Sequence, residues 1–229
     1  MNVAEPSVPD TDTERLERLL AYERSLYLRG LTRIAGVDEA GMGPLAGPVV
    51  AAAVVLPMDR GIMGADDSKK LTARRREALS AEIRGVAIAW SIGIASAREV
   101  DRWNIRVAGL VAMRRALLAL DPVPEHVLVD ARAVPDLPWP QEQRIQADAH
   151  WHAVACASIL AKVHRDRLMR RLDARYPSYG FARHKGYGTP EHLTALREHG
   201  PCPAHRRTFQ WRDSADAQHA LAPRKESER

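Results

Sequence analysis

The chain has 229 residues, of which 45% are hydrophobic and 28% are charged, and its formal net charge is +5. At this length one domain with a sizeable core is expected, and two cysteines are too few for a disulfide scaffold, which indicates a reducing, cytoplasmic environment. No apolar run approaches the roughly 18 residues that a membrane-spanning helix needs, and the N-terminus lacks the basic and apolar segments of a signal peptide, so membrane, secreted and fibrous classes are not expected.

Hydrophobic spacing predicts helices and strands that alternate along most of the chain. The strand at 47–56 is almost continuously apolar, which suits burial on both faces. Pro177 ends a long basic helix, and Pro190 begins a last helix that ends at Gly200. In chain order, the expected elements are a helix at 13–28, strands at 33–38 and 47–56, a helix at 72–84 capped by Thr72, a strand at 86–96, a helix at 104–120, strands at 126–130 and 143–147, and helices at 154–176 and 190–200.

This order predicts an α/β fold in which helices cover one mixed sheet. Residues 1–30 are expected to form a tail and an amphipathic helix, with 1–13 disordered. Residues 31–176 form the main domain. Residues 177–211, which have no predicted strand, form a small C-terminal helical segment, and the polar residues 212–229 form a flexible tail.

The densest chemical signal lies at residues 38–43. Asp38 and Glu39 end an apolar strand and meet a turn with alternating glycines at 41–43. Such a turn lets the backbone approach a ligand closely, because no Cβ stands in the way. A dinucleotide-binding turn also follows a strand, but it must open a helix. Here the glycines lead to Pro48 and a valine-rich strand, which argues against that alternative.

Two further aspartates, Asp130 and Asp148, each follow a short apolar stretch. Alone, each is more often a turn-forming or capping residue. Together with Asp38 and Glu39 they predict a cluster of acids at the carboxyl ends of strands. Two carboxylates about 4 Å apart repel by roughly 4 kcal/mol at an effective dielectric constant of about 20. A hard divalent cation, magnesium or manganese, removes that conflict and favours all-oxygen ligands.

Basic residues cluster at 69–76 and again at 162–185. On their own, such clusters are equally well explained as solvated helix faces. Beside an acidic metal site they favour an anionic substrate that extends past the site. Two metal ions roughly 4 Å apart can activate water and stabilise the leaving oxygen in phosphodiester hydrolysis. The residues therefore suggest a metal-dependent phosphodiesterase.

The histidines and cysteines offer zinc as an alternative. Cys156 lies inside a predicted alanine-rich helix, where a cysteine more often packs as a small apolar group. The stretch 199–205 is better explained as a loop after a helix. A structural zinc site is therefore the weaker hypothesis. The residues that it would use are His150, His152, Cys156 and His164, with His199, Cys202 and His205 downstream.

Several motifs resemble those of bacterial ribonuclease HII, the type 2 ribonuclease H. Residues 34–56 have the sequence IAGVDEAGMGPLAGPVVAAAVVL, which is similar to the opening block of that family. The resemblance covers about 31–209, in order. The other matching blocks are DSKKL at 67–71, NI at 104–105, VLVD at 127–130, ASILAKVHRD at 157–166, YPSYGFARHKGYGT at 176–189 and HRRTF at 205–209.

The resemblance implies a ribonuclease H-like fold for 31–176 and a substrate-binding role for 177–211. It implies cleavage of the RNA strand in RNA–DNA hybrids, and nicking of duplex DNA at embedded ribonucleotides, in replication and repair. The products would carry a 5′-phosphate and a 3′-hydroxyl. Two divalent ions, Mn²⁺ or Mg²⁺, would act at the site, and a monomer is expected. The implied catalytic and metal-binding residues are Asp38, Glu39, Asp130 and Asp148.

Selection of RNA over DNA depends on the 2′-hydroxyl, which can donate and accept hydrogen bonds. By the resemblance, the backbone of the glycine turn and an aromatic ring recognise it. Lys162 could instead support the acid cluster from within, and Arg165 is expected to pair with Asp166 or with a helix end. The implied substrate contacts are Gly41, Met42, Gly43 and Tyr187, with Lys69, Lys162 and Lys185 as phosphate contacts.

Two departures from the family pattern are visible. Met42 stands where arginine is usual, and Gln146-Ala147 stands where Lys-Gly is usual. Both changes remove positive charge beside a polyanion, which weakens binding and flattens its salt dependence. They leave open a hybrid-binding protein that has lost turnover. A magnesium-dependent phosphatase shares the acid chemistry but gives Tyr187 no use.

Overall fold

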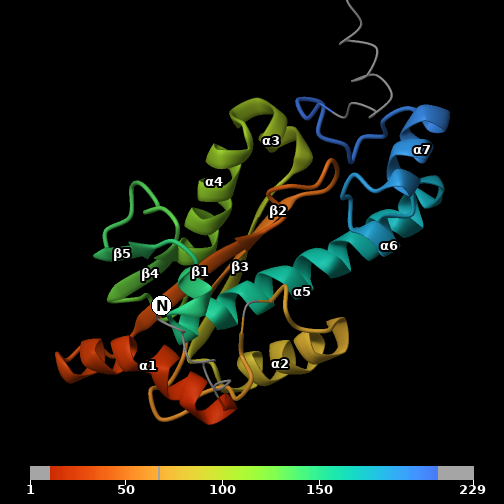
Figure 1. Cartoon of the computed structure of the whole chain (residues 1–229). Coiled ribbons are helices and arrows are strands. Elements are labelled where there is room, and N and C mark those ends of the chain that lie inside the picture. The colour runs from red at the N-terminus through yellow and green to blue at the C-terminus, as the bar shows by residue number, and fades with distance from the viewer. Residues whose placement is uncertain (1–10, 67, 211–229) are drawn as a thin grey trace, which may run out of the picture.

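The computed structural model describes residues 11–66 and 68–210, and within them the chain forms one five-stranded mixed sheet in the order β3-β2-β1-β4-β5 (Figure 1). The central strand β1 pairs antiparallel with β2 and parallel with β4. The predictions for 1–10 and for the 212–229 tail lie outside the described residues. The strands are β1 (Ile34–Ala40), β2 (Val49–Val55), β3 (Ala89–Ala95), β4 (His126–Asp130) and β5 (Gln141–Arg144).

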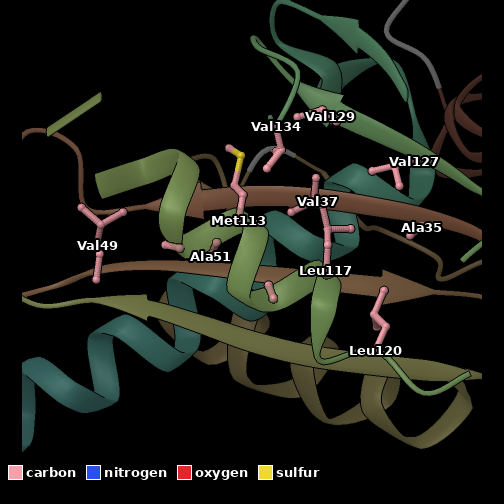
Figure 2. Packing of buried hydrophobic residues seen from close by; sticks show 14 of the residues in the cluster. Ala35, Val37, Val49, Ala51, Met113, Leu117, Leu120, Val127, Val129 and Val134 are labelled. Carbon is pink, nitrogen blue, oxygen red and sulfur yellow. The ribbon is translucent and has the colours of Figure 1, made fainter. Parts of the chain in front are cut away.

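Helices cover both faces of the sheet. On one face, α4 packs against an alanine- and valine-rich core, and Figure 2 shows Met113 and Leu117 of this helix among Val37 and Ala51 of the strands. On the other face lie α2 and α5, whose apolar side chains meet Ala52 and Val54 of β2. The helices of this layered core are α1 (Asp12–Leu28), α2 (Ala73–Val86), α3 (Ala97–Trp103), α4 (Ile105–Leu118) and α5 (His152–Arg175).

The long helix α5 lies directly on β1, because Gly36 leaves room for it. A Cβ at this position would overlap the backbone of Ala153. The close approach puts the face of α5 that carries Ser158 and Lys162 beside the carboxyl end of β1. Contact between backbones thus fixes one wall of the candidate site.

The segment after α5 forms a separate small cluster at the end of that helix away from α1 (Figure 1). It is tied to the turn between β1 and β2 by an isolated β-bridge between Ala46 and His205. Its core packs Phe181 and Leu196 against Met169 of α5. The segment consists of η2 (Pro177–Tyr179), α6 (Phe181–His184) and α7 (Pro190–His199), and η1 (Ala147–Ala149) precedes α5.

Most predicted elements are confirmed, including the Thr72 cap, whose hydroxyl accepts a hydrogen bond from Arg75 N–H. The strand predicted at 143–147 exists but is displaced, because β5 runs from Gln141 to Arg144 and Ile145, beyond its end, is 77% exposed. The helix α3 was not predicted from the sequence. Within the described ranges, every helix is too short or too polar to cross a membrane.

Candidate active site

Asp38 and Asp130 come together because β1 and β4 are parallel neighbours. Val37 pairs with Val129, so the next residue on each strand reaches the same edge of the sheet. Asp148 follows in η1, which is fixed to β4 by a hydrogen bond from Ala147 N–H to Asp130 Oδ1 of 2.8 Å. These aspartates and Glu39 line one cavity of about 510 Å³. The acids predicted from separate stretches of sequence are thus brought together.

Asp38 is the buried acid of this acid cavity, whereas Glu39, Asp130 and Asp148 are half-buried. Asp38 is only 6% exposed, and burial, followed by the charges of Glu39 and Asp130, raises its pKa well above the usual value. Burial and the charge of Asp130 raise the pKa of Glu39 to about 7, against an opposing effect of Lys69. At neutral pH the protein alone therefore disfavours full ionisation of this edge.

The donor set fits divalent cations by its chemistry. It offers carboxylate oxygens, which hard ions prefer, and their mutual repulsion falls when a cation enters. In the part of the chain that the structure describes, no three His, Cys, Asp or Glu side chains converge closely enough to hold an ion as they stand. The carboxylates therefore surround a shared cavity without forming a finished cage. The same observation leaves the zinc hypothesis without support among the described residues.

The helix α5 adds polar groups that sequence analysis missed or placed differently. The Ser158 hydroxyl forms a hydrogen bond that opposes the rise in the Asp38 pKa, and it lies 3.0 Å from Ser68 Oγ. Lys162 lines the same cavity one turn later, and its Nζ donates to Asp166 Oδ1 at 2.7 Å. The spacing of four residues between Ser158 and Lys162 was the available signal, since it places both on one helix face.

The predicted substrate contacts separate into two groups. Tyr187 is 47% exposed, and its Cε1 lies 3.6 Å from where a Cβ on Gly43 would stand, so the ring adjoins the glycine turn. Lys185 lies outside the residues that line the acid cavity, and its Nζ donates to the Ala182 carbonyl. The predicted residues that line this cavity with the acids are Gly41, Met42, Gly43, Lys69, Lys162 and Tyr187.

Buried arginines hold the loop from the glycine turn to β2 through its carbonyl groups. Arg165, which is 1% exposed, donates to the carbonyls of Pro48 at 3.1 Å and Ala46 at 3.2 Å. Gly41 has φ +103°, and a Cβ there would overlap the Arg165 side chain. Of the two partners expected for Arg165, Asp166 binds Lys162 instead, whereas a helix-end partner is found, because Arg165 Nη1 donates at 3.1 Å to the carbonyl of Lys185, the C-cap residue of α6.

Arg206, in the C-terminal segment, also donates hydrogen bonds to this loop. This side chain is 2% exposed and donates to the carbonyls of Gly41 at 2.6 Å, Pro44 at 2.7 Å and Gly47 at 3.0 Å. Its guanidinium also lies 5.1 Å from the ring centroid of Phe209. These hydrogen bonds hold the backbone of the turn in place before any ligand binds. The amide groups of the turn therefore keep a fixed orientation.

Met42 turns its side chain toward α4. Its sulfur would lie 3.3 Å from a Cβ on Gly109, and both residues line a second cavity of about 190 Å³ beside the acids. Arg106 of α4 and Arg132, just after β4, also line this cavity. Positive charge therefore reaches the neighbourhood of residue 42 although the methionine carries none.

A mixed sheet whose central parallel strands end in carboxylates, with helices on both faces, defines the ribonuclease H-like class of α/β proteins. The family model described as ribonuclease HII matches residues 35–212. The ribonuclease HII of Geobacillus kaustophilus is 59% identical over 196 residues, which are 86% of this chain and 75% of that protein. The chain belongs to the ribonuclease HII family.

Other relatives agree with this placement. The ribonuclease HII of Moorella thermoacetica is 52% identical over 198 residues, covering 86% of this chain and 96% of that protein. The crystal structure of ribonuclease H2 from Pyrococcus horikoshii OT3 superimposes with a TM-score of 0.67 at 28% identity, covering 78% of this chain and 94% of that one. Family membership makes the chain a hydrolase of the nuclease class, of ribonuclease H type.

Proposed function

We propose that this protein is an endoribonuclease that cleaves the RNA strand of RNA–DNA hybrids and nicks duplex DNA at embedded ribonucleotides. Cleavage leaves a 5′-phosphate and a 3′-hydroxyl. The observation that carries the proposal is that one cavity is lined both by the acids Asp38, Glu39, Asp130 and Asp148 and by the glycine turn with Tyr187. Hydrolytic and ribose-recognising groups thus face the same space.

Asp38, Glu39, Asp130 and Asp148 would hold two divalent ions, Mn²⁺ or Mg²⁺. When bound, such ions supply an activated water and stabilise charge on the leaving oxygen. Burial of Asp38 makes its ionised form unstable without a positive partner, so this edge favours cations over bulk water. Lys69 contributes positive charge beside Glu39 and lowers the pKa of that carboxyl.

The glycine turn and Tyr187 would select the ribonucleotide. A backbone amide can donate to a 2′-hydroxyl, and a deoxyribose offers no such acceptor. The Tyr187 ring, 3.6 Å from the Cβ position of Gly43, would pack on the neighbouring sugar. Because Arg206 holds the carbonyls of Gly41 and Met42 and Arg165 holds the Pro48 carbonyl beyond the turn, the amides of the turn need no rearrangement when the sugar binds.

The test is a nicking assay on duplex DNA that carries one ribonucleotide, with Mn²⁺ and then with EDTA. Metal-dependent nicking on the 5′ side of a phosphate, with none on the all-DNA duplex, is expected. Tight binding without nicking would indicate a hybrid-binding protein that has lost turnover. Hydrolysis of small phosphoesters without nicking would indicate a phosphatase.

A further inference from the structure

A cluster of buried histidines lies beneath Tyr187 and takes no part in the acid cavity. His184 is 9% exposed, His192 is 0% exposed and His205 is 5% exposed. The rings of His184 and His192 stack with their centroids 4.4 Å apart. We call His184, His192 and His205 the histidine cluster. Buried imidazoles must satisfy both ring nitrogens, so the partners of each ring assign its protons.

The hydrogen bonds of His192 assign its tautomer. Its Nδ1 lies 2.9 Å from the Tyr187 carbonyl, which can only accept, so Nδ1 carries the proton. Its Nε2 is then an acceptor. The Nε2 of His205 lies 3.0 Å away and must donate to it. The reverse assignment would place the bare Nδ1 of His192 against the Tyr187 oxygen, two acceptors face to face.

The partners of His205 agree with this direction. With the proton on Nε2, its Nδ1 accepts from Cys202 N–H at 3.0 Å. The Cys202 thiol lies 3.2 Å from the same nitrogen and the Cys202 carbonyl 3.3 Å from it, farther than the N–H donor. The hydrogen bonds therefore run in one direction, from Cys202 through His205 and His192 to the carbonyl of Tyr187. A second proton on either ring would bring two donors together.

The histidine cluster also adjoins the glycine turn. The residue after His205 is Arg206, which donates to the carbonyls of that turn. In addition, Arg206 N–H donates to the Leu45 carbonyl at 2.9 Å, and Leu45 N–H donates to the Gly186 carbonyl at 2.8 Å. Hydrogen bonds and short chain segments thus connect the turn to Gly186 on one side and, through His205 and His192, to the Tyr187 carbonyl on the other.

We propose that His192 and His205 are positioning residues that set the distance between Tyr187 and the glycine turn, and through it the preference for a ribonucleotide over a deoxyribonucleotide. This inference rests on the proposed function. His192 holds the Tyr187 backbone from below, and His205 joins His192 to the strand-like segment that carries Arg206. Loss of the His192–His205 hydrogen bond would let the ring and the turn move independently.

Amide side chains give a matched test, because each copies one ring nitrogen. Glutamine places its amide where Nε2 stands, so His205→Gln keeps a donor toward His192. Asparagine places its amide where Nδ1 stands, so His205→Asn loses that donor. The readout is the ratio of dissociation constants for an all-DNA duplex and a duplex with one ribonucleotide, measured in EDTA. His199→Asn, at an exposed histidine at the end of α7, is the control.

We expect His205→Asn to reduce the binding preference about fivefold, the effect of one net hydrogen bond of about 1 kcal/mol. His205→Gln and His199→Asn should retain it. A loss in both His205 variants, or in neither, overturns this inference alone. A wild-type protein that binds both duplexes equally overturns the proposed function, and this inference with it.

A measurement on the unmodified protein covers the case in which a variant fails to fold. Nitrogen-15 NMR of the imidazole rings distinguishes Nδ1–H from Nε2–H tautomers directly. The inference requires the Nδ1–H form for His192 and the Nε2–H form for His205 at neutral pH. The opposite pair, or a doubly protonated ring at either position, overturns it whatever the enzyme cleaves.

Discussion

The acid cavity and the histidine cluster both contain titratable groups that are shielded from water. Such shielding disfavours the charged form of each group, and the two regions respond to it in opposite ways. In the acid cavity, burial and like charges raise the pKa of Asp38 and Glu39. In the histidine cluster, burial lowers the pKa of every ring, that of His205 to about 4, and each neutral ring has hydrogen-bond partners. Under the proposed function, cations would complete the first region, whereas the second has its hydrogen-bond partners in the folded protein.

This difference assigns separate tasks to the two regions. A reactive centre gains from charges that are stabilised only when the ions and the substrate are present. A recognition element gains from a backbone that is fixed beforehand, because less order has to be imposed on binding. The buried arginines extend the second region, since Arg165 and Arg206 meet carbonyl oxygens in place of carboxylates.

The largest effect is expected from Asp130→Asn in the acid cavity. The substitution keeps the shape and the acceptor for Ala147 N–H but removes one charge. We expect nicking to fall by roughly 1000-fold or more, because charge stabilisation by bound metal supplies several kcal/mol. Binding of the duplex should change far less. Asp136→Asn, the same change at an exposed loop position, is the control, and an equal loss in both variants would contradict the assignment.

The next largest effect is expected at Arg206, in the region whose backbone is fixed before binding. Arg206→Lys keeps the charge but loses the fork that reaches several carbonyls. Leaving buried acceptors unpaired should lower the free energy of unfolding by about 3 kcal/mol. The adjacent exposed residue supplies the control, because Arg207→Lys should stay within about 0.5 kcal/mol of wild type. Chemical denaturation measures both, and similar values would show that Arg206 does not hold the turn.

A pH series sharpens the contrast. Because the pKa of Glu39 rises from 4.5 to about 7 on folding, the folded protein binds more protons than the unfolded chain. The contribution of Glu39 to the free energy of unfolding without metal should therefore fall as pH rises from 4.5 through about 7, whereas the buried histidines, whose pKa values are lowered, contribute in the opposite direction. Stabilisation by Mn²⁺ should increase over the same range, since the ligands must lose protons. Thermal unfolding with and without Mn²⁺ at pH 6 and pH 8, roughly one unit on either side of that pKa, measures both trends.

A second buried acid supplies the control for this series. Glu23 is 3% exposed, accepts a hydrogen bond from Ala153 N–H at 2.8 Å, and has its pKa raised to about 7 by burial. It lies outside the lining of the acid cavity. Glu23→Gln should remove the contribution of Glu23 to the pH dependence of the metal-free protein, so the difference in stability between wild type and variant falls as pH rises, and it should leave the Mn²⁺ effect intact. A Mn²⁺ effect that disappears in this variant would place the ions elsewhere.

The smallest effect is expected at Met42. Met42→Arg should tighten binding of the hybrid a few-fold at moderate salt and steepen its logarithmic salt dependence by about one. The gain is limited because Arg106 and Arg132 already bring charge to the adjoining cavity. Met58→Arg, which adds the same charge beside a different cavity, is the control. Equal affinity of Met42→Arg and wild type would show that the side chain does not face the substrate.

Much of the fold could be predicted because periodicity records burial. The apolar strand β2 and the long helix α5 carry such patterns. The edge strand β5 does not, since Gln141–Arg144 is polar and held to β4 by backbone pairing. The exposed Ile145 drew the prediction too far along the chain. For α3, the Ser96–Glu99 capping box was present in the sequence but marks a helix too short to show periodicity.

The candidate site, too, has a part that could be predicted from the sequence and a part that could not. The acids could be predicted because each ends an apolar stretch, and the parallel pairing of β1 and β4 then brings Asp38 and Asp130 together. The partners of Arg165 and Arg206 could not be predicted, because they are backbone carbonyls, which every residue has whatever its type. For Lys185, whose side chain donates to the carbonyl of Ala182 in the preceding helix α6, the phosphate contact implied by the matching motif stays a prediction.

Calorimetric titration of Mn²⁺ into wild type and Asp38→Asn at pH 7, roughly the raised pKa of Glu39, tests the central claim most directly. Repeating it in buffers with different ionisation enthalpies counts the protons released. The account predicts that wild type binds Mn²⁺ with release of protons and that Asp38→Asn binds it much more weakly. Equal binding by the two proteins, or binding without proton release, would contradict the claim that the carboxyl groups at the end of β1, whose pKa values are raised, lose protons and bind cations.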